Sequence, residues 1–162
     1  MKVSATDSGD RLKRTEFRRK LFLLTIVGGI VFWLATFVTS LLPIAAAYRA
    51  AYSNWSIQTV WVGSVFAGML FSCCVSYFYL RFYDKIPTMS PVLKSLLVST
   101  VALVIAILII DVPMVLQSEQ FVLHYFFIGV LFNSVRFLLL GFAIGFVYKR
   151  LNDTVDSNPS AS

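Results

Sequence analysis

The sequence contains few of the side chains from which metal sites and nucleophilic active sites are built. It has one histidine and two cysteines, and only 14% of its residues are charged. Cys73 and Cys74 are adjacent, and neighbouring helical side chains diverge, so a disulfide between them is disfavoured and we expect both to be small buried residues. The sequence also lacks a nucleophile elbow, a phosphate loop and a dinucleotide fingerprint. We therefore expect no metal, no cofactor and no enzymatic activity.

Apolar residues are abundant, and they predict the class of protein. The chain is 58% hydrophobic with a mean hydropathy of +0.79, and a soluble core of this size could not bury so much apolar surface. About 20 helical residues are needed to cross a bilayer core of about 30 Å. Four stretches meet that length, residues 21–47, 57–79, 92–116 and 122–148. They predict an all-α integral membrane protein, a bundle of four transmembrane helices.

Basic residues flank these stretches in a pattern that predicts orientation. Because cytoplasmic flanks carry excess lysine and arginine, both termini are expected in the cytoplasm, most simply at the plasma membrane. Residues 1–20 form a basic cytoplasmic segment and residues 149–162 a disordered cytoplasmic tail. The net charge of +6 thus indicates topology and contact with anionic inner-leaflet lipids rather than nucleic-acid binding. The residues expected to contact lipid headgroups are Arg14, Arg18, Arg19 and Lys20.

Arg136 is the most informative single residue, because it lies near the middle of the apolar stretch 121–148. A guanidinium stays protonated in proteins and must find a carboxylate, carbonyls, water or a lipid phosphate. Asp111 is the expected partner, since helical side chains lean toward their own N-terminus and the two would lean toward each other. Asn133 shares a helical strip with Arg136, and Thr100 shares one with Asp111. These four residues form the candidate intramembrane polar site.

Small residues at helical spacing predict where the helices touch, because membrane helices approach most closely where side chains are small. The expected packing residues lie in the second and fourth stretches, and either contact within the bundle or homo-oligomerisation would use them. They are Gly63, Ala67, Gly68, Ser72, Ser76, Ser134, Gly141 and Gly145.

A weak internal similarity relates the two halves of the chain. When residues 79–84 are aligned with residues 148–153, Ser72 and Ser76 fall on Gly141 and Gly145, and with one extra residue Pro43 falls on Pro113. This alignment favours two parallel helical hairpins, an arrangement that small transporters also use. Chance similarity is the competing interpretation, since tyrosine and arginine recur at the inner ends of membrane helices.

Three functional hypotheses follow. The leading one is an accessory, assembly or structural partner within the bilayer, because no complete transport or catalytic apparatus is visible. The second is a transporter or channel protomer in which Arg136, with Asp111, binds an anion or gates a path. A small membrane enzyme acting on lipid is the third. The partners expected are the lipid bilayer and either a second copy of the chain or another membrane protein.

Overall fold

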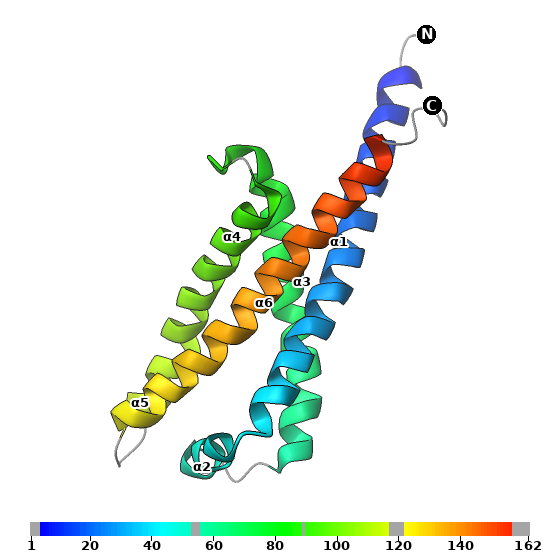
Figure 1. Cartoon of the computed structure of the whole chain (residues 1–162). Coiled ribbons are helices and arrows are strands. Elements are labelled where there is room, and N and C mark those ends of the chain that lie inside the picture. The colour runs from blue at the N-terminus through cyan, green and yellow to red at the C-terminus, as the bar shows by residue number, and fades with distance from the viewer. Residues whose placement is uncertain (1–3, 53–55, 89, 117–121, 157–162) are drawn as a thin grey trace.

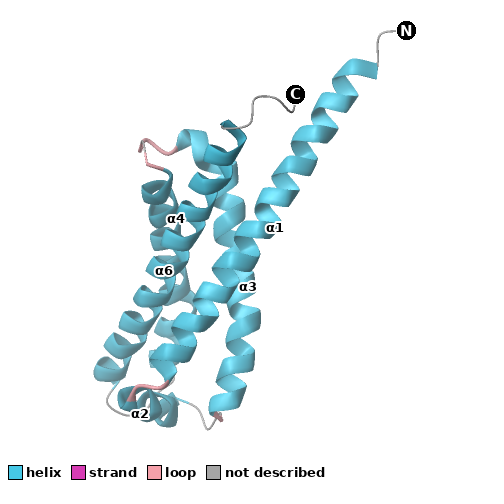
Figure 2. Cartoon of the chain, turned by 45° about the vertical axis from the view of Figure 1, so that its right-hand side comes forward, coloured by secondary structure: helices cyan, strands magenta, loops and turns pink. Residues whose placement is uncertain are grey.

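The computed structural model describes residues 4–52, 56–88, 90–116 and 122–156, and in them the chain is helical without a strand (Figures 1 and 2). The helices are α1 (Ser4–Ser40), α2 (Pro43–Tyr52), α3 (Ile57–Phe82), α4 (Pro91–Ala106), α5 (Val112–Leu116) and α6 (Val122–Asp156). A short 3-10 turn, η1 (Tyr83–Lys85), follows α3, and a π-helical turn, η2 (Ile107–Asp111), joins α4 to α5. The expected all-α fold is confirmed.

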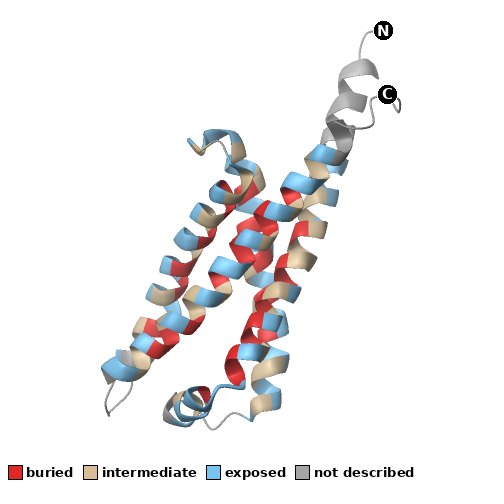
Figure 3. Ribbon diagram, viewed as in Figure 1, coloured by how far each residue is buried: buried red, intermediate tan, exposed pale blue. Residues whose placement is uncertain are grey.

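Four of these helices are long and apolar enough to cross a membrane, namely α1, α3, α4 with η2, and α6. Their outward faces remain apolar, as Phe66 and Leu131 illustrate with exposed fractions of 73% and 62%. Figure 3 shows the buried residues as bands where helices face one another, with exposed residues on the outside. Such a surface is typical of a multi-pass membrane protein, whose lipid-facing side chains are as apolar as its core.

The four long helices form two hairpins. In the first hairpin α1 packs along α3, and in the second α4 packs along α6, while α6 also lies against α1 and joins the two (Figure 1). The start of α1 and the end of α6 lie at the same end of the bundle, together with η1 and the start of α4. We call this the basic end, and the other, where α2 and α5 lie, the α2 end.

Both hairpins close through glycine and serine. A Cβ atom placed on Gly28 would overlap the Ser72 hydroxyl oxygen, and one on Gly141 would lie 2.5 Å from the Ser99 hydroxyl oxygen. At Gly145 the obstacle is backbone, since a Cβ would lie 2.6 Å from the Cα of Val92. Helices in lipid gain stability from such close approach, because lipid supplies no hydrophobic drive toward association.

Other expected packing residues divide between the interior and the surface. Gly68 approaches the Gly29 carbonyl, Ser72 and Ser76 are buried, and Ala67 is partly buried. Ser134 donates a hydrogen bond to the Val130 carbonyl of its own helix at 2.7 Å. Gly63 makes no contact within the bundle, because it is exposed and a Cβ there would meet nothing within 4 Å, so of its two expected uses only homo-oligomerisation stays a prediction. Helical spacing alone could not tell which small residues face a neighbour.

The cysteines also differ from the sequence prediction. Cys73 and Cys74 are free and exposed on the outer surface of α3. They lie between Ser72 and Val75, which are both buried. The serine side of α3 therefore faces the bundle, and the thiols face outward. The smaller side chain therefore takes the close contact, and the more apolar thiol faces the surface expected to meet lipid.

The two prolines within the predicted stretches have different effects on helix boundaries. The first stretch was expected to continue to residue 47, but α1 ends at Ser40 and Pro43 begins the separate helix α2, where its missing N–H costs nothing. Pro113, by contrast, stays within a continuous helical path. The helix widens into the π turn η2 just before Pro113, where the Val112 N–H donates to the Ile107 carbonyl five residues earlier. A proline cannot donate to the carbonyl four residues earlier, so a π turn relieves the mismatch.

The terminal helices are longer than expected. The first stretch was expected to begin at residue 21 and residues 149–162 to be disordered, yet α1 begins at Ser4 and α6 reaches Asp156. Residues 1–3 and 157–162 lie outside the described part of the chain. In Figure 1 both extended ends reach past the rest of the bundle, and the turned view of Figure 2 shows that the start of α1 projects away from the end of α6.

Candidate functional site

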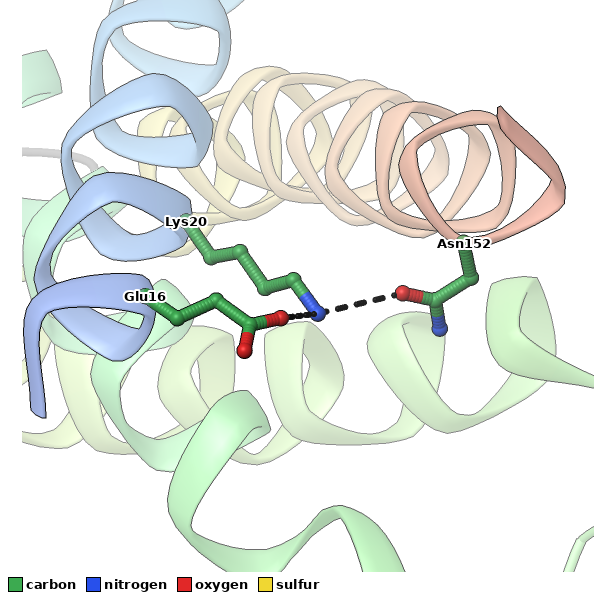
Figure 4. A network of polar contacts seen from close by, with 3 residues as sticks. All are labelled: Glu16, Lys20 and Asn152. Atoms are coloured by element: carbon green, nitrogen blue, oxygen red, sulfur yellow. Dashed lines mark hydrogen bonds and ion pairs between the residues drawn. The ribbon is translucent and has the colours of Figure 1, made fainter. Parts of the chain in front are cut away.

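At the basic end, the predicted headgroup residues lie on α1 in two different environments. Arg14, Arg18 and Arg19 are exposed. Lys20 is partly enclosed, and its ammonium forms an ion pair with Glu16 at 2.8 Å and donates to Asn152 Oδ1 of α6 at 3.3 Å (Figure 4). The three arginines therefore face outward from the bundle, whereas Lys20 links α1 to α6.

Three tyrosines form a compact cluster at the same end. The rings of Tyr79, Tyr83 and Tyr148 lie 4.8 to 5.4 Å apart between centroids. The Lys94 ammonium lies 4.0 Å from the centre of the Tyr83 ring and donates to the Tyr83 carbonyl at 2.7 Å. Because this lysine supplies a cation to the aromatic faces from within the chain, the cluster resembles a filled cation site rather than an open ligand cage.

The candidate polar site lies toward the α2 end, where three elements meet. Asp111 is the last residue of η2 and is 5% exposed, while Asn133 and Arg136 are partly buried on α6. The third contributor is Thr39, in the last turn of α1, with an exposed fraction of 8%. We call Asp111, Asn133, Arg136 and Thr39 the polar cluster.

Hydrogen bonds connect the polar cluster in a chain. The Asn133 amide nitrogen donates to Asp111 Oδ2 at 2.9 Å and to Oδ1 at 3.3 Å. The amide oxygen of the same Asn133 accepts from Arg136 Nη1 at 3.2 Å. Arg136 Nη2 then donates to the Thr39 hydroxyl at 3.4 Å. Asn133 therefore uses both ends of its amide, and the chain of bonds joins η2, α6 and α1.

The expected direct contact between Arg136 and Asp111 is therefore replaced by an indirect one. Within the described residues these two side chains form no ion pair, because Asn133 lies between the carboxylate and the guanidinium. An amide can donate to one charged group and accept from the other, which satisfies both without bringing them together. The three-residue spacing from Asn133 to Arg136 places both on one helix face and permits this bridge.

Thr100, the fourth residue of the predicted site, lies elsewhere. It is exposed, and its hydroxyl donates at 2.9 Å to the Leu96 carbonyl of its own helix. The wheel projection from Asp111 failed because the π turn inserts an extra residue between the two positions. Thr100 and Asp111 therefore do not share one face of the helix, contrary to the sequence prediction.

Arg136 also lies at the C-terminal end of α1, where carbonyl groups lack intrahelical partners. Arg49 of α2 reaches the same end and donates to the Ser40 carbonyl at 3.3 Å. Trp61 of α3 adds a bond from its indole nitrogen to the Ser40 hydroxyl at 2.8 Å. Two cations at a helix C-terminus complement the negative end of its dipole, so this end of α1 is stabilised from both α2 and α6.

One donor of Arg136 stays unused. The Nε atom is buried and has no hydrogen-bond partner among the described residues, although buried N–H groups are normally bonded. Sequence reasoning identified Arg136, Asn133 and Asp111 but missed Thr39, because a threonine that ends an apolar helix gives no sign of which neighbour it will face.

Comparison with known proteins found no family model, no curated protein and no solved structure that matches this chain.

Proposed function

We propose that this protein works within the bilayer as an accessory, assembly or structural partner of other membrane components. The observation that supports the proposal is that the polar cluster uses its hydrogen bonds to hold the bundle together. Both carboxylate oxygens of Asp111 accept from Asn133, and two guanidinium nitrogens of Arg136 have partners within the chain. A site that binds and releases a solute needs groups that can exchange partners.

The free-energy cost of placing a charge inside a membrane supports the same proposal. An isolated charge inside a bilayer costs several kcal/mol or more, so a bonded arrangement that joins α1, η2 and α6 is far more stable than its separated parts. Such a tie holds three segments at fixed positions, and a rigid scaffold is what an assembly partner needs. The basic end, with its exposed arginines, would lie at the cytoplasmic surface of the plasma membrane by the charge rule.

A transporter or channel protomer is the second candidate, and the unused Arg136 Nε favours it. A buried donor without a partner could bond an anion or a water molecule that enters from the α2 end. In that case Asp111 and Asn133 would act as a gate that releases Arg136 toward the solute.

Flux and complex size distinguish the two candidates. Purified protein in liposomes is expected to give no chloride or phosphate flux above that of empty liposomes. In native membranes the protein is expected to migrate as a complex that contains another protein.

The variant Arg136→Gln should lower the melting temperature in detergent, while Lys149→Gln, which removes an exposed charge, should leave it unchanged. A flux that Arg136→Gln abolishes at unchanged melting temperature would support the transporter. Consumption of added lipid would instead support an enzyme.

A further inference from the structure

A lateral groove opens between α3 and α4. Its volume is about 540 Å³ and its lining is apolar throughout. Aromatic side chains of α3 form one wall, and branched aliphatic side chains of α4 form the other. The lining includes Phe71, Phe78, Phe82, Leu97, Val101 and Ile105. The last three are 47% to 53% exposed, so the groove is open to the side rather than sealed.

The groove exists because α4 has two unlike faces. Ser95 and Ser99 are fully buried, and this small face packs against Gly141 and Gly145 of α6. The bulky face of α4 is left toward α3, where branched and aromatic side chains keep the two backbones apart. An apolar space of this kind is not left empty in a membrane, since lipid surrounds the protein on all sides.

The shape of the groove fits a narrow occupant. Its lining runs over residues 71–82 of α3 and residues 97–110 of α4 and η2, which correspond to lengths of about 17 and 20 Å at 1.5 Å per residue. One leaflet of the hydrocarbon core is about 15 Å deep. The α3 wall, which ends at Phe82 at the basic end, therefore matches the length of an acyl chain in the leaflet at that end.

Charge at one mouth of the groove indicates what headgroup accompanies that chain. The lining reaches Phe82 and Ile86 at the basic end. Lys85 lies between them in sequence, is exposed, and places its ammonium 5.7 Å from the centre of the Phe82 ring. Arg81 is exposed one residue before Phe82. A cation beside an apolar slot is complementary to a phosphate attached to an acyl chain.

We propose that the α3–α4 groove binds one anionic phospholipid, with an acyl chain along Phe78 and Val101 and the phosphate at Lys85. The site does not depend on the proposed function, because neither the polar cluster nor a protein partner takes part in it. It differs from general contact between basic helix ends and the membrane in having a defined stoichiometry of one lipid.

Native mass spectrometry of protein released from nanodiscs that contain equal phosphatidylglycerol and phosphatidylcholine tests the site. The wild-type protein should retain one phosphatidylglycerol. Val101→Phe fills the groove and should lose that lipid, whereas Val104→Phe is its control, because Val104 is similarly exposed on α4 but does not line the groove. Lys85→Gln should reduce the preference for phosphatidylglycerol about five-fold, and Lys149→Gln, on another helix, should not.

Equal lipid retention by Val101→Phe and Val104→Phe would overturn the proposal, as would an unchanged preference in Lys85→Gln. A photo-crosslinking amino acid at position 101 in native membranes provides a second measurement that does not depend on how the phenylalanine variant folds. It should form an adduct with phospholipid. An adduct with a polypeptide, either a second copy or another protein, would show that a helix covers the groove instead.

Discussion

The two hairpins close through the same kind of contact between their long helices and differ at the α2 end. Glycine meets serine in both, Gly28 against Ser72 in the first and Gly141 against Ser99 in the second. Toward the α2 end, however, the first hairpin breaks before Pro43 and the second continues past Pro113 through a π turn. Small residues therefore determine how closely the helices approach, while the prolines determine where polar groups can meet.

This difference creates the room that the polar cluster occupies. Because α1 stops at Ser40, Thr39 and its neighbouring carbonyls face Arg136 and Arg49. Because the second hairpin widens at η2, Asp111 turns toward Asn133. Had both prolines acted alike, either α1 would have covered Arg136 with apolar side chains or Asp111 would have lain on another face.

Loss of Asn133 should cost the most stability. Asn133→Leu leaves both Asp111 and Arg136 without their shared partner, and breaking buried charged contacts costs about 3 kcal/mol or more. Ser134→Ala is the matched control, since the Ser134 hydroxyl bonds only its own helix. Unfolding in detergent with increasing denaturant measures both. Equal stability of the two variants would show that the cluster contributes nothing to the bundle.

A larger side chain at the contact between α4 and α6 should cause the next largest loss of stability. Gly145→Leu forces a side chain against the backbone of Val92, and overpacking of this kind costs about 1–3 kcal/mol. Gly63→Leu makes the same change where a Cβ meets nothing within 4 Å and should leave the melting temperature in detergent nearly unchanged. If Gly63→Leu proved the more harmful, α3 would use that face for association, and cross-linking would then reveal a dimer.

Removal of Pro113 should have a smaller and more local effect. In Pro113→Ala, residue 113 regains an N–H that can bond the carbonyl four residues earlier, so the π turn can revert to α-helix. Asp111 would then rotate away from Asn133, and the gain in helix bonding would offset part of the lost contact. We expect a stability loss of about 1 kcal/mol, with a shift in the NMR resonance of the Asn133 side-chain amide. An unchanged resonance would mean that Pro113 does not cause the turn.

The sequence predicted the helices well because length and apolarity are sufficient to identify them. It also identified Asp111, Asn133 and Arg136, since polar groups in apolar stretches are conspicuous. It did not predict that Asn133 bridges the other two, that Thr39 joins them, or that Thr100 and Gly63 lie outside. Those outcomes depend on the π turn and on which helices become neighbours, and both are consequences of packing between segments far apart in the chain.

The central claim is that Asn133 couples Asp111 to Arg136, and a double-mutant cycle tests it most directly. Unfolding free energies of Asp111→Asn, Arg136→Gln and the double variant give the coupling energy, which should be about 1 kcal/mol or more. The same cycle in the Asn133→Leu background should give a value near zero. A coupling that persists without Asn133 would mean that the carboxylate and guanidinium contact each other directly, and no coupling in either background would mean that the two charges act independently.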